Sequence, residues 1–286
     1  MANVLGIDIG GGMIKGGYFR DGALLGQVKK PTKANTDFPV VYRQLCRVIE
    51  ELSELYGGVD SIGIASPGDI DPKTMTFTKV INIKALEGIN LPEKVTADYR
   101  VPCYLGNDAV AALIGELSLR PAVKSATMLT FGTGLGCATY EDGHFYQGSN
   151  RYNFGHMPLT KNGQLCRCGQ KGCASTYVTA SALRKLASIR LGRPLTCPEF
   201  LDLVHQGDRA ALELLEDYCF MLNRLLTLVE DLTHPYLLLL GGGLMGAQDV
   251  FAPRIDLDPR LYEFATLGNQ AGMTGAMILA MKKGEI

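Results

Sequence analysis

Three cysteines and one histidine form the cluster with the most specific chemistry in this sequence. Cys166, Cys168 and Cys173 fall within eight residues, and His156 precedes the first of them by ten positions. Structural zinc takes four nitrogen or sulfur ligands in a tetrahedron, and short C-x-C and C-x₄-C spacings let one tight loop supply three of them. Cysteines can also be buried packing residues or, in a secreted chain, form disulfides. We predict that these four residues bind a structural Zn²⁺ ion.

The N-terminal residues favour the metal over a disulfide. They contain no cationic segment followed by a long apolar run, which is the pattern of a secretory signal. We therefore expect a cytoplasmic protein with reduced thiols. The remaining cysteines stand among apolar neighbours and are expected to be packing residues: Cys46, Cys103, Cys137, Cys197 and Cys219.

Two glycine loops have the composition of phosphate-binding loops. Gly10–Gly12 follows the apolar run 4–9, and Gly132–Gly134 follows the run 126–131. Such loops expose backbone N–H groups and let a phosphate approach closely, although glycine hairpins also serve as plain tight turns. Because the loop occurs twice, we predict that both loops bind one polyphosphate. Asp8, at the mouth of the first loop, could hold Mg²⁺ directly or through water.

A third glycine run, residues 241–246, matches the G-x-G-x-x-G pattern of dinucleotide-binding proteins. That fold requires a helix, a second parallel strand and an acidic residue about 20 positions on, whereas Pro253 and Pro259 interrupt the residues that follow here. A nicotinamide-dependent oxidoreductase is therefore disfavoured. A nucleotide contact from this run and a purely packing role for its glycines both stay open.

Strands and helices must alternate to position these residues. The runs 4–9 and 126–131 are strand-like, and each continues through its glycine loop into a second strand and an Asp-Gly turn. This internal repeat implies two similar halves. Helical spacing of apolar residues predicts helices over 36–56, 109–117, 210–232 and 272–281, and further strands are expected over 61–65, 104–106 and 236–240. The fold class is α/β.

Composition describes an ordinary globular protein. The chain has 286 residues, of which 47% are hydrophobic and 20% charged, with a formal net charge of −1. This balance gives no global attraction to nucleic acid or to an anionic membrane, and the apolar runs are too short to span a bilayer. We expect a small-molecule partner and two domains, residues 1–117, closed by a C-terminal helix over 270–286, and residues 118–269 with the zinc loop.

Several segments together resemble the ROK family of bacterial sugar kinases over nearly the whole chain. They are Asp8 to Lys15, Ser66-Pro67-Gly68, Asn107-Asp108, Phe131 to Gly136, Gly155-His156, the cysteine cluster, Gly241 to Gly243 and Gly275 to Ala280. The resemblance implies two ribonuclease H-like domains of the actin and hexokinase superfamily, with ATP and sugar meeting in an interdomain cleft. It also implies a homodimer, because dimers are common among such kinases.

The resemblance assigns roles residue by residue. It implies that ATP and its phosphates are bound by Asp8, Gly10, Gly11, Gly12, Lys15, Gly132, Thr133, Gly134, Gly241, Gly242 and Gly243. It implies that the sugar is bound by Gly68, Asn82, Asn107, Asp108, Asn153, His156 and Ser175.

Asp108 is the expected general base. A carboxylate within hydrogen-bond reach of a sugar hydroxyl can accept its proton while the oxygen attacks the γ-phosphate of ATP, and Mg²⁺ spreads the charge. The alternative is structural, because aspartate is a favoured N-cap and a helix is expected to start at Ala109. The other segments favour catalysis over this alternative.

Three positions depart from the family pattern. Asn153 and Ser175 replace two glutamates that contact the sugar in family kinases, and Gly12 replaces a threonine or serine of the phosphate loop. The replacements at 153 and 175 are polar but uncharged, so we expect an altered preferred sugar. The smaller Ser175 could leave room for a glycoside, and the loss of a hydroxyl at Gly12 could weaken ATP binding.

The same departures support a second interpretation, a non-catalytic sugar-sensing member of the family. Repressors of the family carry an N-terminal helix-turn-helix domain, and the phosphate segment here begins at residue 8. We therefore expect no such domain, and the retained Asp8 and Asp108 favour a kinase.

Overall fold

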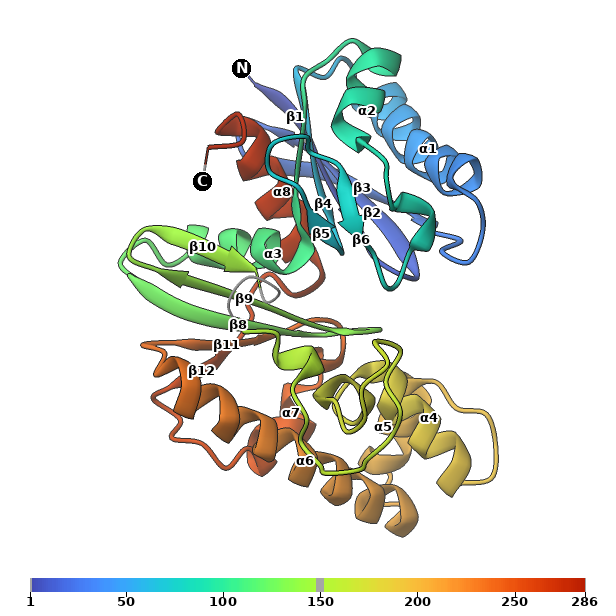
Figure 1. Ribbon diagram of the computed structural model, residues 1–286, viewed down its shortest axis with the longest axis vertical. Coiled ribbons are helices and arrows are strands. Elements are labelled where there is room, and N and C mark those ends of the chain that lie inside the picture. Colours follow the sequence, from blue (N-terminus) through green and yellow to red (C-terminus); the bar gives the residue numbers. More distant parts are fainter. Residues whose placement is uncertain (1, 148–151, 286) are drawn as a thin grey trace. The chain divides into compact units, whose positions relative to one another are not determined.

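The computed structural model describes residues 2–147 and 152–285, and these form two compact units (Figure 1). The first unit contains the residues up to Ala122 together with those from Asn269 onward, and the second contains Val123–Gly268. The chain thus leaves the first unit once and returns to it at its C-terminal end.

The first unit is built on a five-stranded mixed sheet with the order β3-β2-β1-β4-β7. Three consecutive antiparallel strands are followed by two that run parallel to β1. The strands are β1 (Asn3–Ile9), β2 (Met13–Arg20), β3 (Ala23–Pro31), β4 (Ser61–Ser66) and β7 (Cys103–Asn107). A separate small hairpin pairs β5 (Asp69–Ile70) with β6 (Phe77–Lys79).

The second unit repeats this topology. Its sheet has the order β10-β9-β8-β11-β12, again with three antiparallel strands followed by two parallel ones. The strands are β8 (Ser125–Phe131), β9 (Leu135–Glu141), β10 (His144–Gln147), β11 (Leu238–Gly241) and β12 (Tyr262–Phe264). The internal repeat expected from the glycine loops and Asp-Gly turns is therefore confirmed.

Two faces of the first sheet are covered by different helices. Helix α1 (Phe38–Tyr56) begins with proline in its first turn, and its Val48 side chain fills the space left by Gly16 on one face. On the other face, α8 (Ala271–Met281) packs its backbone directly on the strands. A Cβ at Gly6 would lie 2.1 Å from the Met273 carbonyl oxygen. Only glycine in the strand allows this approach, which brings the start of α8 to the carboxyl end of β1 (Figure 1).

Helix α3 (Asp108–Ser118) starts where β7 ends and packs on α8. The two helices also approach through glycine, because a Cβ at Gly275 would lie 1.7 Å from the Ala111 carbonyl oxygen. Helix α2 (Leu91–Tyr99), capped by the Asn90 side chain, completes this unit together with the single turn η1 (Lys84–Leu86).

The core of the second unit lies mainly around the long helix α6 (Arg209–Thr233). Asp208 caps its start, and its buried face carries leucines together with Tyr218, whose hydroxyl donates to the Val178 carbonyl. The other helices of this unit are α4 (Ala180–Arg190), α5 (Cys197–His205) and α7 (Gln248–Phe251), and its single 3-10 turns include η3 (Phe154–His156), η4 (Ala174–Thr176) and η5 (Leu244–Gly246).

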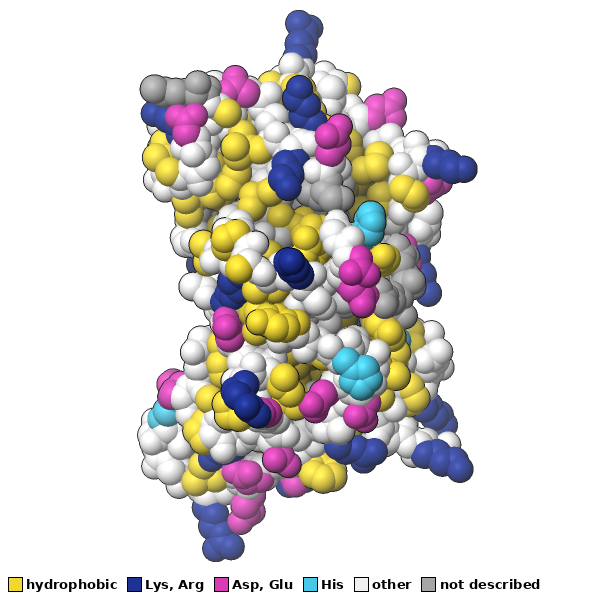
Figure 2. Space-filling view, turned by 90° about the vertical axis from the view of Figure 1, so that its left-hand side faces the viewer, with side chains coloured by type: hydrophobic (Ala, Val, Ile, Leu, Met, Phe, Trp, Pro, Cys, Tyr) yellow, Lys and Arg dark blue, Asp and Glu magenta, His cyan; other side chains and the backbone are white. Residues whose placement is uncertain are grey.

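The predicted elements are all present, with boundaries that differ by up to two residues. The strand expected over 236–240 begins at Leu238, and Tyr236 is 75% exposed. Helices α2, α4, α5 and α7, strand β12 and the hairpin of β5 and β6 were not predicted. Figure 2 shows basic and acidic side chains interspersed over one face, as the near-zero net charge suggests. Among the described residues, no helix combines the length and apolar character needed to cross a membrane.

Candidate functional site

Two carboxylates come together at the carboxyl edge of the first sheet. Asp8 lies on β1, opposite Ala65 of β4, and β4 in turn pairs Ser66 with Asn107 at the end of β7. Because the three strands are parallel, their carboxyl ends meet at one edge. Asp108 follows immediately as the first residue of α3. Residues 8 and 108 are thus neighbours in space although 100 positions separate them.

Asn107, not Asp108, caps helix α3. Its backbone is extended, and its Oδ1 accepts hydrogen bonds from the N–H groups of Ala109 at 3.0 Å and Val110 at 3.2 Å. Its amide nitrogen donates to the Gly68 carbonyl at 3.4 Å. The N-cap role considered for Asp108 therefore belongs to its neighbour Asn107. The second amide N–H of Asn107 is the group that could still bind a ligand.

A backbone hydrogen bond orients the Asp108 side chain, which does not cap the helix. Its Oδ1 accepts one hydrogen bond from the Ala109 N–H at 2.9 Å. Burial, followed by the neighbouring charge of Asp8, raises the pKa of Asp108 to about 7, against a usual value of 3.8. A carboxyl group whose pKa lies near neutrality suits a general base better than an ordinary aspartate does.

Asp8 lies against Lys15 and the start of α8, and Lys15 in turn contacts Asn269. Burial raises its pKa, and the ammonium of Lys15, with Nζ 3.9 Å from Oδ2, partly offsets this effect. The same Nζ donates to Oδ1 of Asn269 at 3.1 Å. Gly272, in the first turn of α8, lies so close that a Cβ there would be 2.8 Å from Cγ of Asp8. Sequence reasoning missed Asn269 and Gly272.

Two further predicted sugar residues lie in the first unit. Gly68 follows β4 with φ of +122°, and a Cβ there would lie 2.8 Å from Cγ2 of Val80. Its backbone conformation therefore requires glycine. Asn82 is half-buried in the bend between β6 and η1. Gly68 joins the carboxylate pair through Asn107, whereas no described contact joins Asn82 to it.

The first phosphate-loop candidate is a closed turn between β1 and β2. The Gly10 N–H donates to the Met13 carbonyl at 2.9 Å, and the Thr32 side chain donates to the Gly10 carbonyl at 2.6 Å. A Cβ at Gly12 would meet nothing within 4 Å. The fold therefore does not require glycine at position 12. Gly11 lies at the tip of the same turn.

The equivalent turn of the second unit lies between β8 and β9. The Gly132 N–H donates to the Gly134 carbonyl at 3.0 Å, and Thr133 stands between them. The glycines after β11 have a clear packing reason, because a Cβ at Gly242 would lie 2.5 Å from the Phe131 nitrogen and its φ is +85°. Gly241 likewise leaves space for Met128. Gly243 then leads into the single turn η5, not into the long helix of a dinucleotide fold.

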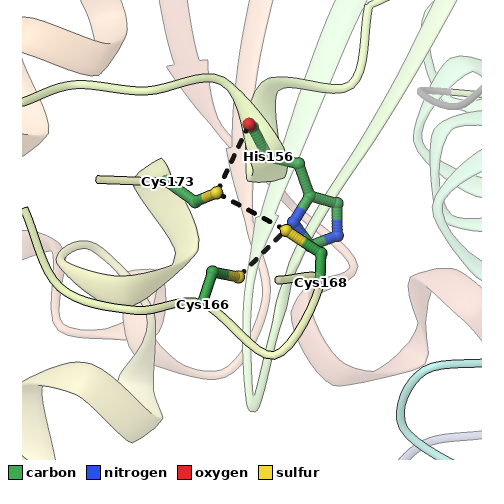
Figure 3. Close-up of side chains that lie close together, drawn as sticks. All are labelled: His156, Cys166, Cys168 and Cys173. Atoms are coloured by element: carbon green, nitrogen blue, oxygen red, sulfur yellow. Dashed lines mark hydrogen bonds between the residues drawn. The ribbon is translucent and has the colours of Figure 1, made fainter. Parts of the chain in front are cut away.

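The predicted metal ligands converge in one loop of the second unit (Figure 3). His156 ends η3, and Cys166 and Cys168 lie on a hairpin closed by a bridge between Leu165 and Lys171. Cys173 follows this hairpin and forms a second bridge with Pro158. Two left-handed glycines shape this hairpin, Gly169 with φ of +93° and Gly172 with φ of +81°. A Cβ at Gly172 would lie 2.0 Å from the Thr160 carbonyl oxygen, so only glycine fits there.

The distances between the donor atoms fit a tetrahedral zinc ion. Sγ of Cys168 and Sγ of Cys173 are 3.7 Å apart, Sγ of Cys166 and Nδ1 of His156 are 3.6 Å apart, and all four donor atoms lie within 4.8 Å of one another. Zn–S bonds of about 2.3 Å and Zn–N bonds of about 2.0–2.1 Å give tetrahedron edges of about 3.8 Å and about 3.6 Å. The residues present therefore fit Zn²⁺.

The thiols of the loop respond differently to their surroundings. Burial opposes ionisation of Cys166, but the Cys168 N–H and the Ser175 hydroxyl outweigh it, so the pKa of Cys166 is lowered. Burial and the neighbouring sulfurs raise the pKa of Cys173 to about 12. A cation among the sulfurs would stabilise all three thiolates.

The family follows from comparison with known proteins. Residues 4–283 match the ROK family. The chain belongs to the ROK family. Two curated ROK relatives are an N-acetyl-D-glucosamine kinase of Escherichia coli, 28% identical over 300 residues that cover 96% of this chain and 98% of that protein, and a glucokinase of Thermotoga maritima, 27% identical over 272 residues that cover 87% and 85%.

The fold agrees with solved ROK structures. The ROK family glucokinase from Streptomyces griseus in complex with glucose and AMPPNP gives a TM-score of 0.83 at 24% identity, covering 98% of this chain and all of that one. This likeness confirms the α/β fold.

The two neutral residues that depart from the ROK pattern lie beside the metal ligands. Asn153 is exposed at the start of η3, and its carbonyl accepts from the His156 N–H at 2.9 Å. Ser175 is half-buried in η4, with its hydroxyl 3.6 Å from the Cys166 sulfur. The contact of Ser175 with a ligand sulfur was not expected from the sequence.

Proposed function

We propose that this protein is an ATP-dependent sugar kinase. The observation that carries the proposal is the pair of partly buried carboxylates, of which Asp108 is oriented by the Ala109 N–H while Asn107 takes over the capping of α3. A phosphoryl-transfer enzyme needs positioning and charge stabilisation more than covalent chemistry. The hydrogen bond from the Ala109 N–H and the raised pKa of Asp108 support its role as the proton acceptor.

The proposed reaction transfers one phosphoryl group. Asp108 accepts the proton of a sugar hydroxyl, the sugar oxygen forms a bond to the γ-phosphorus of ATP, and the bond from that phosphorus to the bridging oxygen breaks to release ADP. Asp8 would hold Mg²⁺, which when bound neutralises phosphate charge. Lys15 is placed to add a positive charge beside Asp8.

The remaining ATP contacts would come from the glycine turns of both units. The backbone N–H groups of the turns at Gly10–Gly12 and Gly132–Gly134 would bind phosphate oxygens, since each turn follows a strand of the repeated fold. Gly241–Gly243 would lie near the adenosine, although Gly241 and Gly242 also have the packing reasons given above.

The acceptor is proposed to be a hexose, an amino sugar or a glycoside, reacting through a primary hydroxyl. Gly68, Asn82, Asn107, Asn153, His156 and Ser175 would bind it together with Asp108. The curated relatives are named for two different sugars. Because the Asn153 amide and the Ser175 hydroxyl are uncharged, we propose neither of these two sugars as the specific substrate of this protein.

The metal is proposed to be structural. His156 and the three cysteines supply four protein ligands, which leaves no open position for catalysis. Zn²⁺ would hold the loop that carries Ser175 and the segment that carries Asn153. Homodimerisation and a cytoplasmic location remain predictions from the sequence.

A non-catalytic sugar sensor is the second candidate, and the uncharged Asn153 and Ser175 are the observations that favour it. A coupled assay of ATP consumption over hexoses, amino sugars and glycosides, run with wild type and Asp108→Ala, separates the two. We expect one group of sugars to stimulate ATP consumption in the wild type only. Sugar binding without any Asp108-dependent consumption would support the sensor.

A further inference from the structure

Ser175 makes a contact that its place in the ROK pattern does not explain. Its Oγ lies 3.6 Å from Sγ of Cys166, within hydrogen-bond distance for sulfur. The Cys166 sulfur also receives the backbone N–H of Cys168. Two donors from different parts of the loop thus converge on one proposed metal ligand.

The position of Ser175 is fixed by its backbone neighbours. The Ala174 N–H donates to the Met157 carbonyl at 2.9 Å, and the Thr179 hydroxyl donates to the Ser175 carbonyl at 3.0 Å. Ala174 is fully buried. The hydroxyl of Ser175 is therefore presented to the sulfur by a well-anchored turn, and a change confined to the side chain leaves this anchoring in place.

The direction of the hydrogen bond follows from the chemistry of the ligand. A cysteine that binds a metal is a thiolate and has no proton to give. A serine hydroxyl has one proton and two lone pairs. With metal bound, the hydroxyl must donate to the sulfur, and its oxygen can then only accept hydrogen bonds from other partners.

We propose that Ser175 is a supporting residue of the metal site, whose hydroxyl donates to the Cys166 thiolate and helps to retain the metal. The proposal rests on the metal site proposed above and not on the kinase activity. It has one consequence for the sugar. At a position where the ROK pattern has a glutamate, this chain presents a neutral acceptor whose direction is fixed by the metal site.

The test compares two variants of nearly equal shape, Ser175→Thr and Ser175→Val. Each is loaded with Zn²⁺, and the metal is titrated away with a chromophoric chelator of known affinity. Loss of an outer-shell partner typically weakens metal binding about 10- to 100-fold. We therefore expect Ser175→Thr to stay within about threefold of wild type, and Ser175→Val to bind Zn²⁺ at least about tenfold more weakly.

Cobalt supplies a second measurement on the same proteins. In the Co²⁺-loaded protein, the sulfur-to-metal charge-transfer band should move to longer wavelength in Ser175→Val, because a thiolate that loses a hydrogen bond donates electrons more readily. Ser118→Ala is the matched control. It also removes one serine hydrogen bond, from Oγ to the Gly115 carbonyl at 2.6 Å, but in the first unit. It should leave metal affinity and spectrum unchanged.

Equal Zn²⁺ affinity and equal Co²⁺ spectra for the valine and threonine variants would overturn the proposal. Absence of stoichiometric Zn²⁺ binding by the wild type would overturn it together with the metal site. Neither result bears on ATP consumption, so failure of this inference is distinct from failure of the kinase function.

Discussion

Replacing Asp108 by asparagine should lower activity and at the same time raise stability. The substitution keeps the size of the side chain and the oxygen that accepts from the Ala109 N–H at 2.9 Å. It removes a negative charge that is partly buried and lies near Asp8. Residues that serve catalysis commonly cost stability in this way, whereas a residue selected for folding should lose stability on replacement.

The size of the expected gain in unfolding free energy follows from the pKa of Asp108. Burial and the charge of Asp8 raise this pKa to about 7 from the usual 3.8. At about 1.4 kcal/mol per pH unit, ionising Asp108 in the folded protein costs at most about 4 kcal/mol more than in the unfolded chain. Solvent at the half-buried side chain reduces this limit, so we expect a gain of about 1–3 kcal/mol for the asparagine variant at pH 8.

The stability of the wild-type protein should depend on pH through Asp108. Because the folded pKa is raised, the folded protein holds the proton more tightly than the unfolded chain, and stability decreases as the pH rises from about 4 to about 7. The advantage of Asp108→Asn should therefore be small at pH 4.5, grow up to pH 7 and level off above it. Urea unfolding without nucleotide at pH 4.5, 6 and 8 measures it.

Asp208→Asn is the matched control. Asp208 caps α6 through its side chain, and asparagine caps a helix about as well as aspartate. This variant should change stability by less than about 0.5 kcal/mol at every pH. If Asp108→Asn were less stable than wild type at pH 8, or if its advantage did not depend on pH, the view of Asp108 as a carboxylate destabilised for catalysis would be wrong.

Three further outcomes are expected. The value of kcat/KM should fall about tenfold per pH unit below about pH 7, as Asp108 becomes protonated, and a pH profile flat down to pH 5.5 would contradict this. Gly272→Ala should lower kcat/KM for ATP about 10- to 100-fold by displacing Asp8, whereas Gly58→Ala, where a Cβ meets nothing within 4 Å, should be near wild type in the same steady-state assay. Removing the metal with a chelator should lower Tm by more than about 5 °C in a thermal scan, and added Zn²⁺ should restore it; an unchanged Tm would count against a structural metal.

Local sequence patterns predicted the repeated architecture well, because each signal is confined to a few residues. An apolar run, a glycine loop and an Asp-Gly turn follow one another in both halves. Asp21 and Asp142 indeed have φ of 50° and 51°, and the glycines after them 83° and 82°. The cluster of candidate metal ligands was predictable for the same reason, because its three cysteines fall within eight residues.

The N-cap of α3 could not be assigned from local sequence signals. Asn107 and Asp108 are both favoured N-cap residues, and a shift of one position decides which of them is available as the proposed general base. Only the backbone conformation settles it, with Asn107 extended at φ of −68° and ψ of 142°. The sequence predicted the start of this helix to within one residue. An error of one residue is enough to exchange the roles of these two side chains.

Asn269 and Gly272 could not be assigned from the sequence, because more than 250 positions separate them from Lys15 and Asp8. The available signal was weak. Gly272 and Gly275 lie three positions apart in an apolar helix, a pattern that indicates close approach to another element without naming it. The contact between Ser175 and Cys166 could not be predicted from the sequence either, because tertiary packing sets the orientation of the hydroxyl.

The role of Asp108 in phosphoryl transfer is tested by following the labelled γ-phosphoryl group of ATP to a sugar with wild type and with Asp108→Asn. Sugar binding to both proteins is measured by calorimetry. We predict a phosphorylated sugar with the wild type, a kcat about 10²–10⁴-fold lower or more in the variant, and similar sugar affinity in both. Transfer at wild-type rate by Asp108→Asn, or sugar binding without transfer by the wild type, would contradict it.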